Sequence, residues 1–179
     1  MKVCGFSGAS GAGKTTLIEG VIRALKAAGQ RVSVVKHAGH GFEIDIPGKD
    51  SHRLRHAGAF EVVIASRNRL VKVREFEFAQ EPTVHQVLAE LVEVDWALVE
   101  GFKHADLLRI EVWRAERDHA PMYPEDPYIV AVATDRPDAM PIATARPVFA
   151  LDDVAGIAAY LLAQGERHHY INPLLRPDA

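Results

Sequence analysis

Residues 8–15 (GASGAGKT) have the types and spacing needed to bind phosphate. They match the phosphate-binding loop pattern G-x-x-x-x-G-K-[ST] at every fixed position. Glycines let successive backbone N–H groups point at phosphate oxygens, and the helix that follows adds its positive N-terminal end. Lys14 supplies a mobile charge for the β- and γ-phosphates, and the Thr15 hydroxyl can ligate the accompanying Mg²⁺. We therefore predict that this loop binds the tail of a nucleoside triphosphate.

Such a loop needs a strand before it and a helix after it, and the flanking sequence supplies both. Residues 2–6 (KVCGF) form a short apolar run, and residues 31–36 (RVSVVK) resemble a second strand. We expect the intervening helix to end near Ala28, with Gly29 in the left-handed cap conformation. Its apolar face comprises Leu17, Ile18, Val21, Ile22 and Leu25. In a β-α-β unit the parallel strands end at one edge of the sheet, so functional residues should gather there.

The rest of the chain alternates predicted strands and helices. Strands are expected at residues 60–66, 70–76, 94–101, 108–113, 128–134 and 148–150. Helices are expected at about 50–57 after an Asp50-Ser51 cap, from a Thr83 cap through Val92, and at about 152–163. This order predicts an α/β fold of the phosphate-loop NTPase type, a three-layer sandwich with a mostly parallel central sheet. The length of 179 residues and the 48% hydrophobic content favour a single domain over 1–179, whose tail from about 165 is least defined by pattern.

Two acids of the predicted strand 94–101 could serve the metal. Asp95 and Glu100 lie at opposite ends of it, about 16 Å apart in extended chain, so one Mg²⁺ cannot contact both. Because the phosphate edge is at the carboxyl end of the strand, Glu100 is the candidate for a metal or catalytic role, and Asp95 is assigned to capping. The alternative for Glu100 is a strand-end acid that caps the next turn.

A loop rich in ionisable residues follows the second predicted strand. Lys36 and His37 should point toward the nucleotide, and Asp45 and Lys49 can approach it from the loop, which could order around the γ-phosphate as switch segments do. The alternative is a solvated polar loop. His37 with His40 is weak evidence for a metal site, and His168 with His169 is weaker.

Asp135, after the predicted strand 128–134, is the candidate reader of the base. A carboxylate there could accept from the N1 and N2 donors of guanine, which adenine lacks. The guanine motif N-K-x-D is absent, so adenine stays open on these residues alone, and a turn cap is the other role for Asp135.

The bulk composition excludes several classes of function. A net charge of -3 provides no basic field for nucleic acid. The single cysteine, Cys4, allows neither a disulfide framework nor a cysteine metal cage, which fits a reducing cytoplasm. The sequence shows neither an apolar run long enough for a membrane span nor a signal-peptide pattern, so we expect a cytoplasmic protein without a membrane partner.

Four stretches together give the chain a specific resemblance. They are residues 8–15, residues 36–51 (KHAGHGFEIDIPGKDS), residues 55–59 (RHAGA) and residues 99–103 (VEGFK). The chain resembles the molybdopterin-guanine dinucleotide biosynthesis protein B (MobB) family. The second stretch is diagnostic, since phosphate-binding loops are widespread. The resemblance covers residues 3–114 best, with Arg109-Ile110-Glu111 and Arg114 also in the expected place.

The resemblance implies a usually homodimeric phosphate-loop domain that binds GTP with Mg²⁺, hydrolyses it weakly and assists the molybdenum cofactor guanylyltransferase. Carried onto this chain, residues Gly11 to Thr16 bind the phosphates, Glu100 acts near the metal, and residues 36–51 report nucleotide state or meet molybdopterin. The chain departs from the family at Gly39 and Gly41, where a His-rich, acidic loop is expected. Taken together, the residues themselves and the resemblance predict these nucleotide contacts: Gly8, Ala9, Ser10, Gly11, Ala12, Gly13, Lys14, Thr15, Thr16, Lys36, His37, Asp45, Lys49 and Asp135.

Two other functions use the same loop. A small-molecule kinase would close an arginine-bearing lid over an acceptor, and Arg53, Arg55, Arg67 and Arg69 could form one. A nickel metallochaperone would need a Cys-x-His motif, which the sequence lacks. For an accessory GTPase we expect slow hydrolysis, because neither an arginine finger nor a glutamine is evident near the loop.

Overall fold

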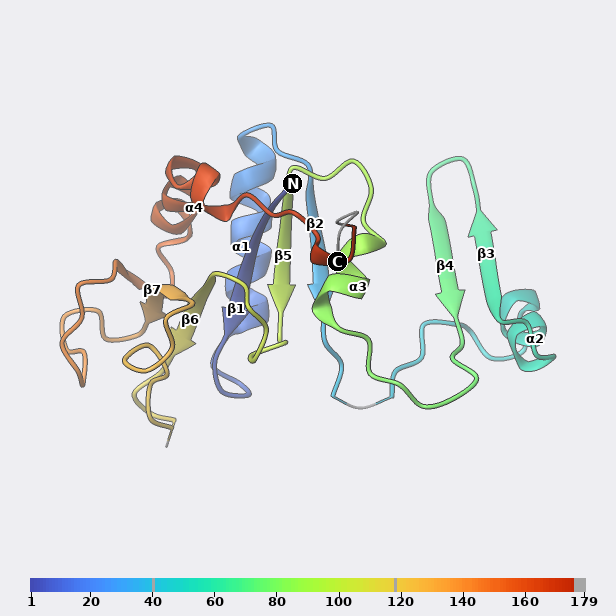
Figure 1. Ribbon diagram of the computed structural model, residues 1–179, viewed down its shortest axis with the longest axis horizontal. Helices are drawn as coiled ribbons and strands as arrows, with labels where there is room; N and C mark the ends of the chain where they lie inside the picture. Colours follow the sequence, from blue (N-terminus) through green and yellow to red (C-terminus); the bar gives the residue numbers. More distant parts are fainter. Residues whose placement is uncertain (40, 118, 176–179) are drawn as a thin grey trace. The chain divides into compact units, whose positions relative to one another are not determined.

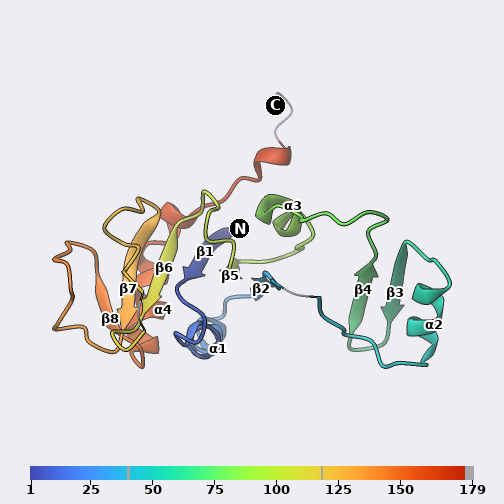
Figure 2. The same cartoon turned by 90° about the horizontal axis from the view of Figure 1, so that it is seen from below.

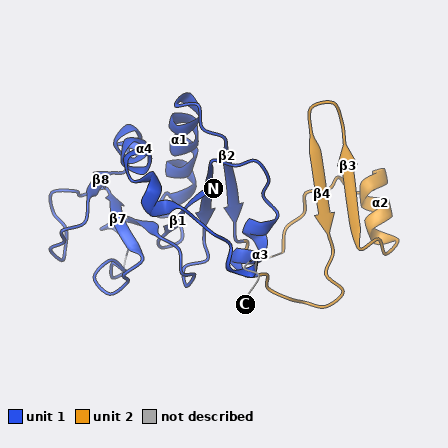
Figure 3. Ribbon diagram, turned by 45° about the horizontal axis from the view of Figure 1, so that its top comes forward, with its two compact units in different colours: residues 1–37, 83–179 blue, residues 38–82 orange. Residues whose placement is uncertain are grey.

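The computed structural model describes residues 1–39, 41–117 and 119–175, so the weak metal prediction for His40 lies outside the described residues. The chain divides into two compact units, one of residues 1–37 with 83–179 and one of residues 38–82 (Figure 3). Each unit is described by itself. The single domain over residues 1–179 stays a prediction.

The first unit contains a parallel six-stranded sheet with the order β2-β5-β1-β6-β7-β8 (Figures 1 and 2). The predicted α/β fold with a mostly parallel sheet is confirmed, and the strand predicted at 148–150 lies at an edge. β1 pairs with both β5 and β6, which places the start of the phosphate loop between two other strand ends. The strands are β1 Lys2–Ser7, β2 Val32–Lys36, β5 Trp96–Glu100, β6 Arg109–Trp113, β7 Ile129–Thr134 and β8 Val148–Ala150.

Helices cover both faces of this sheet. α1 (Lys14–Ala27) and α4 (Val154–Ala163) pack together on one face, and α3 (Val84–Ala89) lies on the other (Figure 2). This confirms the predicted three layers. Two short 3-10 helices, η1 (Gly165–His168) and η2 (Pro173–Leu175), follow α4.

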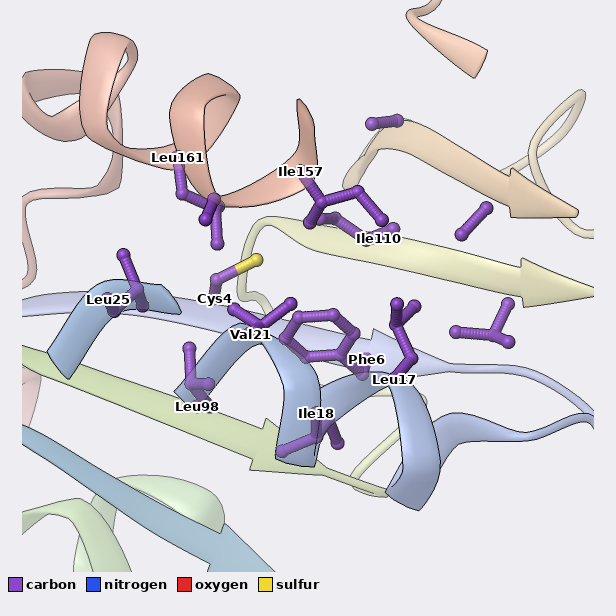
Figure 4. Packing of buried hydrophobic residues seen from close by; sticks show 14 of the residues in the cluster. Cys4, Phe6, Leu17, Ile18, Val21, Leu25, Leu98, Ile110, Ile157 and Leu161 are labelled. Atoms are coloured by element: carbon purple, nitrogen blue, oxygen red, sulfur yellow. The ribbon is translucent and has the colours of Figure 1, made fainter. Parts of the chain in front are cut away.

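Alternating side chains of the strands build one core on each face of the sheet. Trp96 and Leu98 of β5 join the core against α1 and α4, whereas Ala97 and Val99 join the core against α3. The larger core is drawn in Figure 4, where side chains of α1 and α4 meet those of β1, β5 and β6. Burial on both faces explains why the sequence of β5 is a nearly continuous run of apolar residues.

The α1 helix ends as the sequence predicts. Ala28 is its C-cap and Gly29 has φ 79°. The amide of Gly29 donates to Lys26 O at 3.0 Å and that of Gln30 to Leu25 O at 3.1 Å, which is a Schellman motif.

The α3 helix begins as predicted but is shorter. Thr83 and Gln86 form a reciprocal capping box. The helix ends at Ala89, and Val92, expected on its apolar stripe, is 78% exposed. The last turn tightens, because Leu91 N donates to Leu88 O, and Glu93 takes a left-handed φ of 54°. The apolar spacing therefore continued beyond the point where the backbone leaves the helix.

The second unit consists of α2 (Asp50–His56) and an antiparallel pair, β3 (Glu61–Ala65) and β4 (Leu70–Arg74). The two predicted strands and their tight connection are confirmed, and they form a separate two-stranded sheet. Asp50, expected as a helix cap, is instead the first residue of α2, and Lys49 is the N-cap without a side-chain hydrogen bond. The acid still complements the positive end of the helix.

Candidate functional site

The phosphate-binding loop is curled around its own lysine. Lys14 Nζ donates to Gly8 O at 2.9 Å and to Ala9 O at 2.8 Å. Gly8 has φ 147°, and a Cβ there would lie 2.1 Å from Val112 O of β6. Only glycine fits so close an approach to the neighbouring strand. The loop therefore curls around the Lys14 ammonium and packs closely against β6.

The N-terminus of α1 follows directly on this loop. Gly13 is its N-cap with φ 99°, it makes no side-chain cap hydrogen bond, and the first turn contains no acidic residue among those described. Thr15 and Thr16 of that turn are exposed. The first amides of a helix need acceptors from outside it, and an anion can supply them.

Glu100 meets Thr15 at the carboxyl edge of the sheet. Thr15 Oγ1 donates toward Glu100 Oε1 and Oε2, both at 3.0 Å, and Lys36 Nζ lies 3.5 Å from Glu100 Oε1. The register explains the meeting, since Glu100 pairs with Phe6 of β1 and with Lys36 of β2. A hydroxyl and a carboxylate are hard oxygen donors of the kind that Mg²⁺ takes. These two residues fit the predicted metal.

The Lys14 ammonium lies in a partly buried position. Burial lowers the pKa of Lys14; nearby Glu100 raises it and Lys36 lowers it further. Burial without a bound anion therefore disfavours the charged form of Lys14. A phosphate tail brought to the loop would reverse that effect, because an opposite charge favours the ammonium.

His37 packs where β2 ends. Its amide donates to Glu100 O at 2.9 Å, and its ring lies 4.9 Å from the ring of Phe102. Gly101 has φ 92°, and a Cβ there would come within 2.8 Å of His37 Cβ. The structure thus brings Lys36 and His37 to the same edge as Glu100.

Asp135 follows β7 and is already engaged. Its Oδ1 accepts from Ala115 N at 3.2 Å, and its Oδ2 lies 3.9 Å from Arg114 Nη1. These contacts are those of a turn cap, the alternative role considered above. Reading of guanine by Asp135 stays a prediction.

Two arginines lie beside the phosphate loop, contrary to the expectation that none is near it. Arg114 Nε donates to Ala12 O at 2.9 Å, and Arg117 Nη2 donates to Gly11 O at 3.3 Å. They come from the segment after β6, more than 100 residues along the chain from the loop, as the separations of 102 and 106 show. A local motif could not reveal them, although Arg114 belongs to the run that carried the family resemblance.

Comparison with known proteins decides the family. The family model described as molybdopterin guanine dinucleotide synthesis protein B (MobB) matches residues 3–135, well over half of the chain. The chain belongs to the MobB family.

Similar proteins and a solved structure support the assignment of this chain to the MobB family. It is 37% identical over 161 residues to the molybdopterin-guanine dinucleotide biosynthesis adapter protein of Escherichia coli strain K12, covering 88% of this chain and 89% of that one. The protein of the same name from Haemophilus influenzae is 39% identical over 136 residues, 74% of each chain. A crystal structure of a MobB homologue from Bacillus stearothermophilus superposes with a TM-score of 0.69 at 24% identity, covering 93% and 99% of the two chains, which shows the shared fold.

The loop that is diagnostic of MobB closes upon itself within the second unit. Asp45 Oδ1 accepts from Ser51 Oγ at 2.7 Å, and its Oδ2 lies 3.4 Å from Arg55 Nε. Arg55 also pairs with Glu43 at 2.7 Å and Glu75 at 2.6 Å. Three acids thus surround one of the arginines proposed for a kinase lid. Asp45 and Lys49 belong to the second unit, and their approach to a nucleotide stays a prediction.

Two buried charges of β6, to which the sequence pattern gave no role, hold backbone segments of the MobB chain. Arg109 donates to Lys103 O, Ala105 O and Leu107 O, in the segment after Glu100. Glu111 accepts from the amides of Met122 and Tyr123, both at 2.7 Å, and burial raises its pKa. Both act on backbone groups that a sequence pattern does not specify.

His168 is buried, with Nδ1 2.9 Å from Val3 O, which is a structural role. Among the described residues no cluster of three His, Cys, Asp or Glu could hold a metal. A search of the same residues finds no helix with the length and apolar content to span a bilayer.

Proposed function

We propose that this MobB-family chain is a GTP-binding adapter with weak GTPase activity in molybdenum cofactor biosynthesis, where it assists the guanylyltransferase. The observation that carries the proposal is the convergence of Lys14, Thr15 and Glu100 at a curled glycine loop. The names of the relatives, adapter proteins of molybdopterin-guanine dinucleotide biosynthesis, support the biological role.

Under this proposal the phosphates of GTP lie against the amides of residues 8–16, and Lys14 neutralises the β- and γ-phosphates. The Thr15 hydroxyl and Glu100 hold Mg²⁺, which would neutralise phosphate charge when bound. Lys36 and His37 close the edge of the site, while Asp45 and Lys49 respond to nucleotide state. Asp135 is the proposed reader of guanine.

Slow hydrolysis is supported by the bonding of Glu100. Both of its carboxylate oxygens accept from Thr15, and Lys36 lies beside one of them. Because Thr15 and Lys36 already occupy positions beside these oxygens, Glu100 is poorly placed to take a proton from an attacking water. The output of such a site is a change in binding rather than fast turnover.

The proposed partners are a second copy of the chain, the guanylyltransferase and molybdopterin. A two-stranded sheet is marginal alone in water, and the second unit leaves large apolar side chains exposed. Phe78 is 82% exposed and Phe42 69%. Sedimentation analysis with and without Phe78→Ser would test the homodimer. We expect the variant to shift toward monomer, and a wild-type monomer at all concentrations would contradict this proposal.

The central experiment titrates GTP and ATP separately, each with Mg²⁺, against wild type and Lys14→Ala. We expect GTP to bind more tightly and the variant to lose at least about tenfold, since a charged hydrogen bond is lost. Lys26→Ala, which removes a charge from the last turn of the same helix, is the matched control. Unchanged binding by Lys14→Ala would contradict the proposal.

Rapid phosphate release without a partner would contradict the adapter role. Formation of ADP together with a phosphorylated small molecule would favour a kinase.

A further inference from the structure

The segment after β6, residues 114–117, lies against the phosphate loop. Arg114 bonds Ala12 O and Arg117 bonds Gly11 O, at 2.9 and 3.3 Å. The carbonyl of Ala12 belongs to the same peptide unit as the N–H of Gly13, the residue that caps α1. A cation on the oxygen of a peptide unit polarises its N–H and fixes its orientation. Arg114 therefore acts on an amide at the phosphate end of the loop.

Asp135 fixes Arg114 from the other side. Its Oδ2 lies 3.9 Å from Arg114 Nη1, and its Oδ1 accepts from Ala115 N at 3.2 Å. The turn is closed further by Arg117 N, which donates to Arg114 O at 3.1 Å. A carboxylate at the end of β7, a guanidinium and a peptide unit of the loop thus form a continuous chain of contacts.

We propose that Asp135 and Arg114 are positioning residues that preorganise the phosphate loop, with Asp135 acting through Arg114 on the Ala12–Gly13 peptide unit. The inference deepens the proposed function and rests on it, since it assumes that the loop binds phosphate. Preorganisation removes part of the cost of ordering the loop when an anion binds. Arg117 braces the adjacent carbonyl of Gly11 in the same way.

This proposal separates Asp135 from a pure reader of guanine. A base reader affects only ligands that carry the base, whereas a positioning residue also affects a polyphosphate that has none. Inorganic tripolyphosphate with Mg²⁺ is therefore the probe. Asp135→Asn keeps an oxygen for Ala115 N and removes the charge that faces Arg114.

Calorimetric titration of tripolyphosphate compares wild type, Arg114→Ala, Asp135→Asn and the double variant. We expect binding weaker by about tenfold for Arg114→Ala and about threefold for Asp135→Asn. The double variant should bind like Arg114→Ala, because Asp135 acts through that residue. Arg23→Ala, an exposed arginine on α1, is the charge-matched control and should bind like wild type. Loss of GTP binding by Asp135→Asn with tripolyphosphate binding unchanged would overturn the proposal.

Hydrogen exchange of the ligand-free protein provides a second readout that needs no nucleotide. We expect the amides of Ala12 and Gly13 to exchange at least about threefold faster in Arg114→Ala and Asp135→Asn, while β1 stays protected and so reports an intact fold. Unchanged exchange at both amides would overturn the inference. If wild type binds neither GTP nor tripolyphosphate, the proposed function fails, and exchange still decides whether Arg114 and Asp135 hold the loop.

Discussion

The two units of this chain differ in the burial of their large apolar side chains. In the first unit, Phe6 and Trp96 are completely buried between the sheet and its helices. In the second unit, Phe42, Leu70 and Phe78 are each more than 65% exposed, at 69%, 67% and 82%. Hydrophobic burial therefore stabilises the first unit, whereas the second has little apolar surface removed from water.

Charge organises the second unit instead. Arg55 is surrounded by Glu43, Asp45 and Glu75, and hydrogen bonds to Glu75 and Glu43 raise its pKa. In the first unit the comparable arginine, Arg109, is buried and donates to backbone carbonyls. The first unit therefore uses its buried arginine to bind backbone carbonyls, whereas the second unit uses Arg55 to hold three carboxylates together.

The largest contrast is expected between two phenylalanines. Phe6→Ala should lower the free energy of unfolding by about 3–5 kcal/mol, because it leaves a cavity in the core. Phe78→Ala should change the free energy of unfolding of the first unit by about 0.5 kcal/mol or less, because Phe78 lies outside that unit and its core. Urea unfolding followed by tryptophan fluorescence checks both, since Trp96 and Trp113 belong to the first unit. Equal losses would remove the distinction between the units.

A smaller contrast is expected between two glycines. Gly8→Ala places a Cβ 2.1 Å from Val112 O at φ 147°, so we expect a loss of about 2 kcal/mol or more together with weaker tripolyphosphate binding. Gly39→Ala, in the second unit, meets no described atom within 4 Å and should cost about 0.5 kcal/mol or less. Thermal unfolding and titration of both variants measure the difference. Wild-type phosphate affinity in Gly8→Ala would argue against the close fit of loop and strand.

The third expected effect is local to the second unit. Arg55→Ala removes the cation that three acids share, so the loop before α2 should open. Limited proteolysis should then cut within residues 41–49 faster than in wild type, while urea unfolding of the first unit is unchanged. Arg53→Ala, which removes an exposed 3.9 Å ion pair with Asp50, is the matched control. Equally fast cutting of the Arg53→Ala control would show that the ion pairs of Arg55 do not specifically protect this loop.

The smallest effect concerns the buried acid of the first unit. Burial raises the pKa of Glu111, so the folded chain binds its proton more readily than the unfolded chain does. Stability from this group is therefore fully present below its ordinary pKa of 4.5 and falls as pH rises through the raised value. Glu111→Gln should flatten that part of the stability curve, measured by urea unfolding at a series of pH values. An unchanged slope would assign the pH dependence to other groups.

Local patterns predicted those parts of the fold that depend on local physics. The helix after the loop ends at Ala27 because Gly29 permits the left-handed cap, and the apolar run of β5 follows from burial on both faces. The meeting of Thr15 with Glu100 follows from parallel register. The predicted end of α3 was wrong because the apolar spacing typical of a helix continues in the sequence to Leu91 and Val92, whereas the backbone has already left the helical conformation there. Arg114 and Arg117 were missed because only tertiary structure brings them to Gly11 and Ala12.

One junction in the backbone has a mechanical consequence. The first unit gives way to the second after His37, whose amide is bonded to the carbonyl of Glu100. The segment of residues 38–82, which carries the exposed Phe42 and Phe78, is thus connected to the first unit directly after the strand that pairs with the end of β5. Tension applied by a bound macromolecule at the start of that segment would be transmitted first to the end of β2, and from there, through the hydrogen bond of the His37 amide, to the end of β5 that holds Glu100.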